Sequence, residues 1–167
     1  MRRHSCSLRQ TPLILAGVVA GLAILFGVRT AHAAQNSALQ DRLTEAKAVS
    51  CSFTLVTTAT WTKGVASAAT TPIKYSVGFK NIKVDEGSAD AESQFGDSFI
   101  VVRQAGDYLH LIQSYRSGPL YTTTVFARES SSGRFIAVHT RHEFTDVSLP
   151  GITSRPEMYV GDCAVTP

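Results

Sequence analysis

The sequence has little charge and few of the patterns that mark an active site. Of its 167 residues, 17% are charged, 3 are cysteine and 1 is tryptophan. It contains no G-x-S-x-G nucleophile elbow, no glycine-rich phosphate-binding loop and no internal repeat. The 44% hydrophobic content nevertheless allows one globular domain and argues against a disordered chain. We therefore expect a non-enzymatic protein that uses no cofactor.

The long hydrophobic run lies near the N-terminus. Three arginines in the first nine residues precede 17 apolar, small and glycine residues at 12–28, and Ala31-His32-Ala33 follows. This three-part pattern predicts a cleavable signal peptide over residues 1–33, and therefore a periplasmic or secreted protein. The alternative is an uncleaved anchor, because 17 residues is the lower limit for crossing a bilayer. After cleavage we expect no stable membrane span.

The net charge depends on whether this segment is removed. The whole chain carries a formal charge of +3, but four of its 16 basic residues are arginines within 1–33. Without them, 12 basic residues face 13 acidic ones, so the net charge is −1. Nucleic-acid binding needs a concentrated cationic face. We therefore expect no nucleic-acid partner.

Two cysteines remain beyond the predicted signal peptide. Cys51 lies near the start of the folded region and Cys163 near the end of the sequence. An even pair in an exported chain predicts a disulfide. A bridge that closes so long a loop contributes on the order of 4 to 5 kcal/mol in the chain-entropy account. The alternative is a pair of buried thiols.

The hydrophobic periodicity changes once after the signal peptide. Residues 34–49 include Leu39, Leu43 and Ala46 at helical spacing, after a capping Asn36. They predict a short helix. From residue 50 the period becomes two, which predicts an antiparallel β domain over 50–167.

Seven or eight short strands follow, separated by turn residues. In the first, we expect Cys51, Phe53, Leu55 and Trp61 to share one face, and we expect residues 63–72 to form a loop. A parity change near Asn81 predicts a bulge or bend. The second strand is expected over 73–80, where Ile73, Tyr75, Val77 and Phe79 alternate with lysine, serine and glycine. The remaining strands are expected at about 88–95, 99–103, 108–116, 120–128, 135–144 and 158–165. Nearest-neighbour connections favour an up-and-down barrel, with a sandwich as the alternative.

Histidines carry the few candidates for chemistry. On a strand, His142 shares its parity with Ile136 and Val138, so we expect His142 to face inward and His139 and Arg141 to face outward.

His110 has the parity of Tyr108 and would also face inward. His110 and His142 would then form a conceivable acid/base pair of a weak hydrolase, although zinc would lack a third protein ligand. The simpler interpretation is local hydrogen bonding on strands, and we expect no metal.

Aromatic residues come from several of the expected strands. An eight-stranded barrel holds either packed side chains or one small ligand. The residues expected to line such a cavity are Trp61, Tyr75, Phe79, Tyr108, His110 and His142. The leading hypothesis is a binder of a small apolar or amphipathic ligand. The alternative is a module that docks an envelope protein through outward His139, Arg141 and Arg155.

The chain resembles a family of small exported bacterial proteins of uncharacterised function. The likeness rests on Cys51-Ser52-Phe53, Trp61-Thr62-Lys63, Leu109-His110-Leu111-Ile112, Thr123-Thr124-Val125-Phe126, Ala137-Val138-His139-Thr140-Arg141-His142 and Tyr159-Val160-Gly161-Asp162-Cys163. The resemblance implies export and cysteine pairing but no activity. A looser likeness to lipocalin-type barrels concerns architecture only, because Ala59 stands where lipocalins usually have glycine.

Overall fold

The computed structural model describes residues 36–92, 97–144 and 155–167. The predicted signal peptide therefore lies outside the described residues. The chain divides into two units, Met1–Ser37 and Ala38–Pro167, and the fold described below is that of the second unit. Among the described residues, no helix has both the length and the hydrophobicity needed to cross a membrane.

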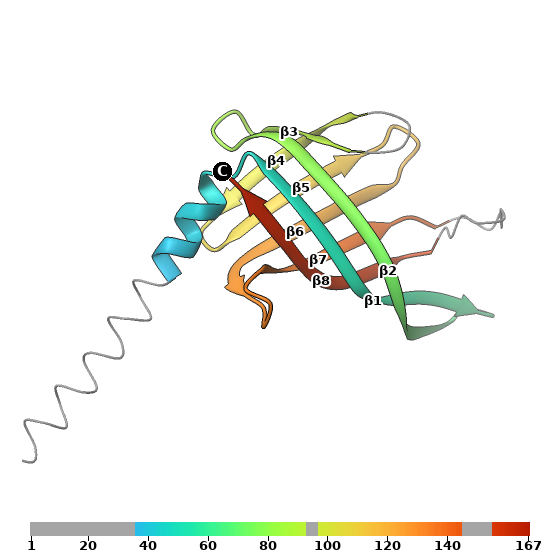
Figure 1. Ribbon diagram of the computed structural model, residues 1–167. Coiled ribbons are helices and arrows are strands. Elements are labelled where there is room, and N and C mark those ends of the chain that lie inside the picture. Colours follow the sequence, from blue (N-terminus) through green and yellow to red (C-terminus); the bar gives the residue numbers. More distant parts are fainter. Residues whose placement is uncertain (1–35, 93–96, 145–154) are drawn as a thin grey trace, which may run out of the picture. The chain divides into compact units, whose positions relative to one another are not determined.

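Eight antiparallel strands form one closed, ring-like sheet (Figure 1). They are β1 (Ala48–Thr62), β2 (Val65–Lys83), β3 (Ser88–Ala91), β4 (Ser98–Ala105), β5 (Tyr108–Ser114), β6 (Leu120–Glu129), β7 (Phe135–His142) and β8 (Glu157–Thr166). Each strand pairs with its sequence neighbour, and β8 pairs with β1. The predicted antiparallel β domain is confirmed, and its strands belong to one sheet rather than to the two sheets of a sandwich.

A short helix precedes the sheet, as the periodicity predicted, and covers residues 36–44. Leu39 and Leu43 are buried in the core cluster of the ring. Arg42 lies over the Phe135 ring, 4.6 Å from its centroid, and pairs with Glu129 at 3.1 Å. These contacts dock the helical residues against the β6–β7 end of the ring.

Strand β1 contains a bulge that reverses its inward face. Phe53 pairs with Gly161 whereas Leu55 pairs with Val160, so Thr54 is an extra residue between them. The buried residues of β1 have odd numbers up to Phe53, and the next buried residue is the even-numbered Val56. The prediction that Leu55 and Trp61 share the face of Phe53 is therefore wrong. The sequence does not reveal this bulge, because the threonines around it show no alternation of apolar and polar residues.

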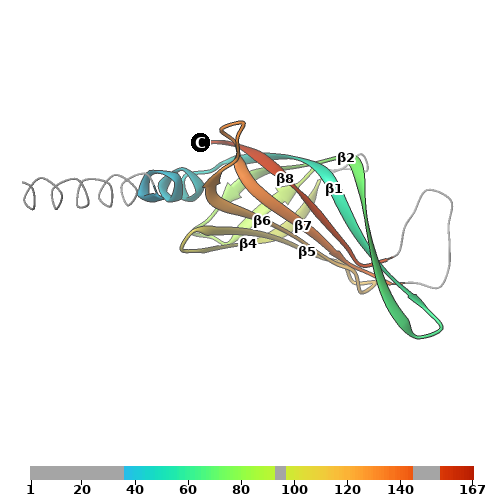
Figure 2. The ribbon, with the colours of Figure 1, turned by 90° about the horizontal axis from the view of Figure 1, so that it is seen from below.

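The hairpin of β1 and β2 is longer than predicted. Lys63 and Gly64 have φ values of 50° and 79°, which makes a tight turn, and pairing begins at once with Thr62 and Val65. The expected loop over 63–72 is therefore wrong beyond its first two residues. The pairing of β8 with β1 stops at Thr58. The rest of the hairpin continues past the ring as a two-stranded arm (Figure 2).

A second irregularity lies in β2, where the sequence predicted a break. Asn81 has a φ of 52°, and the register with β3 shifts between Lys80 and Lys83. Ile82 is completely buried beside this kink, and its N–H donates to the Lys47 carbonyl at 3.1 Å. The predicted bulge is confirmed, and it turns an apolar side chain into the core.

The ring is fastened covalently where its first and last strands meet. Cys51 and Cys163 are direct partners in the β1–β8 ladder and form a disulfide across 112 positions of sequence. Both are fully buried, and Phe135 is the neighbour of Cys163 on β7. The predicted pairing is confirmed in the structure.

Candidate functional site

The inward face of β7 is the opposite of the predicted one. Phe135, Ala137 and His139 are buried, whereas Ile136 is 37% exposed and His142 is exposed. The prediction took the apolar residues at even positions for the core face. That assignment is wrong because Phe135 and Ala137 supply the core contacts, and the outer face of this strand is itself apolar.

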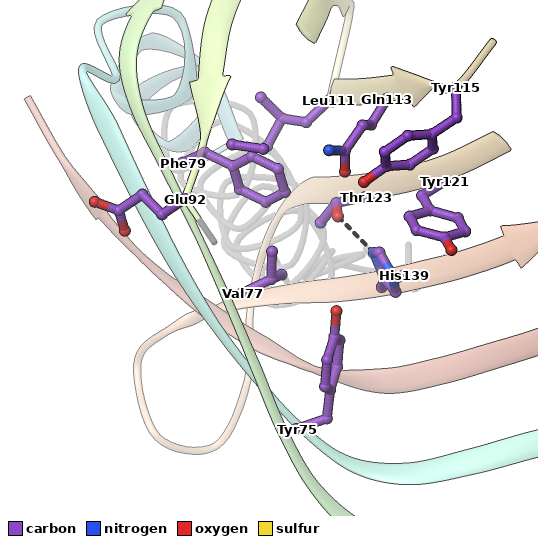
Figure 3. A pocket seen from close by; sticks show the side chains of 11 residues that line it. Tyr75, Val77, Phe79, Glu92, Leu111, Gln113, Tyr115, Tyr121, Thr123 and His139 are labelled. Carbon is purple, nitrogen blue, oxygen red and sulfur yellow. Dashed lines mark hydrogen bonds between the residues drawn. The ribbon is translucent and has the colours of Figure 1, made fainter. Parts of the chain in front are cut away.

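A cavity of about 120 Å³ lies on the inner side of the ring (Figure 3). It is lined by Tyr75, Val77, Phe79, Ala91, Glu92, Leu111, Gln113, Tyr115, Tyr121, Thr123 and His139. Tyr75 and Phe79 were expected at such a cavity, and the structure places both there. In Figure 3 the Tyr75 side chain points from β2 toward His139 on β7.

The other residues expected to line a cavity lie elsewhere. Trp61, Tyr108 and His142 are exposed. His110 lies between buried Leu109 and Leu111 on β5 and therefore faces outward.

The Nδ1 atom of His110 is 3.0 Å from the Thr124 hydroxyl, and its ring stacks on Tyr108 with centroids 6.0 Å apart. His110 and His142 therefore form no inward acid/base pair. The described residues also contain no group of three or more histidine, cysteine or acidic side chains that could hold a metal ion.

His139 is enclosed by aromatic rings. Its ring centroid lies 5.5 Å from that of Tyr159, 5.6 Å from Tyr75, 5.8 Å from Phe53 and 6.1 Å from Tyr121. Burial, together with the positive charge of a nearby arginine, lowers the pKa of His139 to about 4. The imidazole is therefore neutral at neutral pH.

Arg141 joins the polar groups beside this histidine. Its guanidinium lies 3.0 Å from Glu143 and 3.4 Å from Glu157, and it donates to the hydroxyls of Tyr121 at 3.2 Å and Tyr159 at 3.4 Å. The two tyrosines in turn donate to the carboxylates, Tyr121 to Glu143 at 2.7 Å and Tyr159 to Glu157 at 2.5 Å. One guanidinium thus forms ion pairs with two carboxylates and hydrogen bonds to two phenol hydroxyls.

Burial sets the protonation of these phenols. It raises the pKa of Tyr159 to about 12, helped by the hydrogen bond to Glu157, and it raises the pKa of Tyr121 and of Tyr75. Desolvation lowers the pKa of Arg141, but its hydrogen bonds to the tyrosines outweigh that effect and the net change is upward. The tyrosines therefore stay neutral and Arg141 stays charged across the physiological range.

The predicted outward surface of His139, Arg141 and Arg155 is not a single surface. His139 lies inside the ring, and Arg141 extends from the same inner face of β7. Arg155 instead lies over the Phe144 ring, 4.9 Å from its centroid, and Phe144 packs edge-on against Trp61 at 5.7 Å. The docking surface proposed from sequence is therefore wrong for its two β7 residues.

The sequence interpretation named no role for Thr123, Gln113 or Tyr159 at the site. A signal for Tyr159 was present, because the buried Cys163 lies four residues later on the same strand and residues at even spacing share a face. Thr123 is 1% exposed, and its hydroxyl lies 2.8 Å from Nδ1 of His139. A buried threonine next to an inward histidine is visible only once the register of β6 and β7 is known.

Comparison with protein-family models, curated proteins and solved structures finds no match. The resemblance to small exported bacterial proteins and to lipocalin-type barrels therefore remains a prediction.

Proposed function

We propose that this protein is an exported, non-enzymatic up-and-down barrel that binds one small apolar or amphipathic ligand in the cavity beside His139. The observation that carries the proposal is an aromatic-walled cavity lined by buried His139, one ring nitrogen of which has no hydrogen-bond partner among the described residues. Small-molecule sites are typically concave and mostly apolar, with a few placed polar groups. This cavity fits that description.

The cavity volume limits the size of the ligand. An engineered apolar cavity of about 150 Å³ takes up benzene. The cavity in this ring measures about 120 Å³. A ligand about the size of one six-membered ring therefore fits, with Tyr75 and Tyr121 available as aromatic walls. A long acyl chain or a fused-ring molecule would extend beyond this volume.

The two carboxylates that Arg141 binds favour binding over catalysis. Glu143 and Glu157 are both engaged by Arg141 and by tyrosine hydroxyls. A general acid or base must be free to exchange a proton with the ligand. The disulfide between Cys51 and Cys163 supports export, because such bonds persist in oxidising compartments.

Native mass spectrometry of the protein from the exported fraction tests this function. We expect a bound non-covalent mass, and loss of that mass in Val77→Phe, which places a larger side chain in the cavity. Val101→Phe is the matched control, because Val101 is on an exposed face of β4. A bare mass in the folded wild-type protein, together with no binding of single-ring probes, would contradict the proposal.

A further inference from the structure

Two buried nitrogens in the site, Nε2 of His139 and Nε of Arg141, have no hydrogen-bond partner within the described residues. Of these two residues, His139 is the one that lines the cavity. His139 is 3% exposed, and its Nε2 atom is buried. Its other ring nitrogen, Nδ1, lies 2.8 Å from the Thr123 hydroxyl (Figure 3). A buried polar group without a partner has lost its hydrogen bonds to water and gained none in return, which is unfavourable. An unpaired atom of a residue that lines a cavity therefore points to a ligand.

Counting protons decides what Nε2 offers. A neutral imidazole carries one N–H and one bare nitrogen, and a hydroxyl both donates and accepts. If Nδ1 donated to Thr123, the threonine proton and the Nε2 lone pair would both lack partners among the described residues. If Thr123 donates to Nδ1, the Nε2 proton alone lacks a partner in the part of the chain that the structure describes. The second arrangement leaves fewer buried groups unpaired, so Nε2 carries the proton.

We infer that the ligand carries a hydrogen-bond acceptor that receives the Nε2 proton of His139. The inference rests on the proposed function, because it specifies what the same cavity binds. His139 is the specificity-determining residue in this arrangement. Thr123 is a positioning residue, since it fixes the tautomer without needing to touch the ligand.

The surrounding charges favour a neutral ligand. The charged side chain that lines the described part of the cavity is Glu92, whose carboxylate is 4.0 Å from the Lys80 ammonium. Arg141 is committed to two carboxylates, so it offers an anion little unbalanced positive charge. The neutral acceptors that a single-ring ligand can carry are a ring nitrogen, a carbonyl oxygen and an ether oxygen.

Three single-ring probes test the inference, of which pyridine and benzene have nearly equal shape and N-methylpyridinium is one methyl group larger. Pyridine has a ring nitrogen acceptor, benzene has none, and N-methylpyridinium is a cation whose nitrogen is blocked. We would measure the Kd of each for the exported, disulfide-bonded protein by NMR titration at neutral pH. Pyridine is expected to bind about tenfold more tightly than benzene, as one net hydrogen bond implies. N-methylpyridinium is expected to bind no better than benzene.

Variants of the pair separate the hydrogen bond from simple packing. His139→Phe keeps an aromatic ring without the proton, so the preference for pyridine should disappear while benzene still binds. Thr123→Val removes the hydroxyl that fixes the tautomer and should reduce the preference. Thr123→Ser retains the hydroxyl and should restore it. The ¹⁵N shifts of the His139 ring should show a protonated Nε2 in the wild type and a mixture of tautomers in Thr123→Val.

The outcomes distinguish this inference from the proposed function. Equal binding of pyridine and benzene, or an Nδ1-protonated His139 in the wild type, would overturn the acceptor inference while the cavity remained a binding site. If no probe binds and the exported protein has a bare mass, both the function and the inference fail. Tighter binding of N-methylpyridinium than of pyridine would replace the acceptor with a cation site.

Discussion

His139 should make the folded protein sensitive to mild acid. Its pKa falls from the ordinary 6.5 to about 4 in the folded state, mainly through burial and then through Arg141. The unfolded chain therefore binds a proton more tightly than the folded one. The contribution of neutral His139 to the free energy of unfolding is complete above pH 6.5 and is lost as the pH falls toward 4. The shift in pKa corresponds to about 3 kcal/mol.

The groups packed around His139 allow this contribution to be isolated. Arg141 from its own strand, and Tyr75, Tyr121 and Tyr159 from β2, β6 and β8, do not titrate in this range, because the pKa of each is raised. Glu143 and Glu157, which Arg141 binds, and the carboxylates elsewhere are present in the wild type and in its variants alike. A difference between variants therefore reports His139.

Urea unfolding at a series of pH values measures the effect. Wild type is expected to lose about 3 kcal/mol more than His139→Phe between neutral pH and pH 4, provided that both follow two-state curves. His142→Phe is the control, since His142 is exposed on the same strand. If wild type and His139→Phe lost stability in parallel, the buried neutral histidine would be refuted as a source of acid sensitivity.

Two further predictions concern the β1–β8 seam. Replacing Cys51 and Cys163 with alanine should cost about 5 kcal/mol for the loop of 112 positions, and should lower the urea midpoint by about 2 M. An unchanged midpoint would show that the hydrogen bonds between β1 and β8 hold the two strands together without the disulfide. Gly161→Ala should destabilise the fold by about 2 kcal/mol or more, because the added methyl group would meet the main chain of β1. Val160→Ala is the control, because Val160 is exposed, and it should cost less than half as much. Thermal unfolding of the two variants would decide this, and equal losses would count against the close approach.

Turn chemistry made the order of strands readable from the sequence. Asp85-Glu86-Gly87 and Gly106-Asp107 mark chain reversals because glycine adopts positive φ, and Gly87 and Gly106 have φ values of 69° and 54°. The helix and the disulfide followed from spacing and compartment. Closure of β8 on β1 is a long-range contact, and the cysteine pair was its signal in the sequence, because the two residues are direct partners in the β1–β8 ladder.

The site was predicted less well, because it depends on which face of each strand points inward. Alternation identifies two faces but not which one is buried when both carry apolar residues, as Phe135 and Ile136 do on β7. The extra residue at Thr54 moved Trp61 away from the predicted core face. Tyr75 and Phe79 were placed correctly because their strand alternates clearly with lysine and serine.

The bond between Cys51 and Cys163 also determines how the molecule would respond to mechanical tension. It joins residues that are adjacent in space but 112 positions apart in the chain. A pulling force applied to the segments on either side of this bridge passes through the two sulfur atoms, bypassing the strands between them. The cavity and His139 lie within that shielded loop. Stretching the oxidised protein should therefore leave the site intact, whereas reduction would expose every strand to the load.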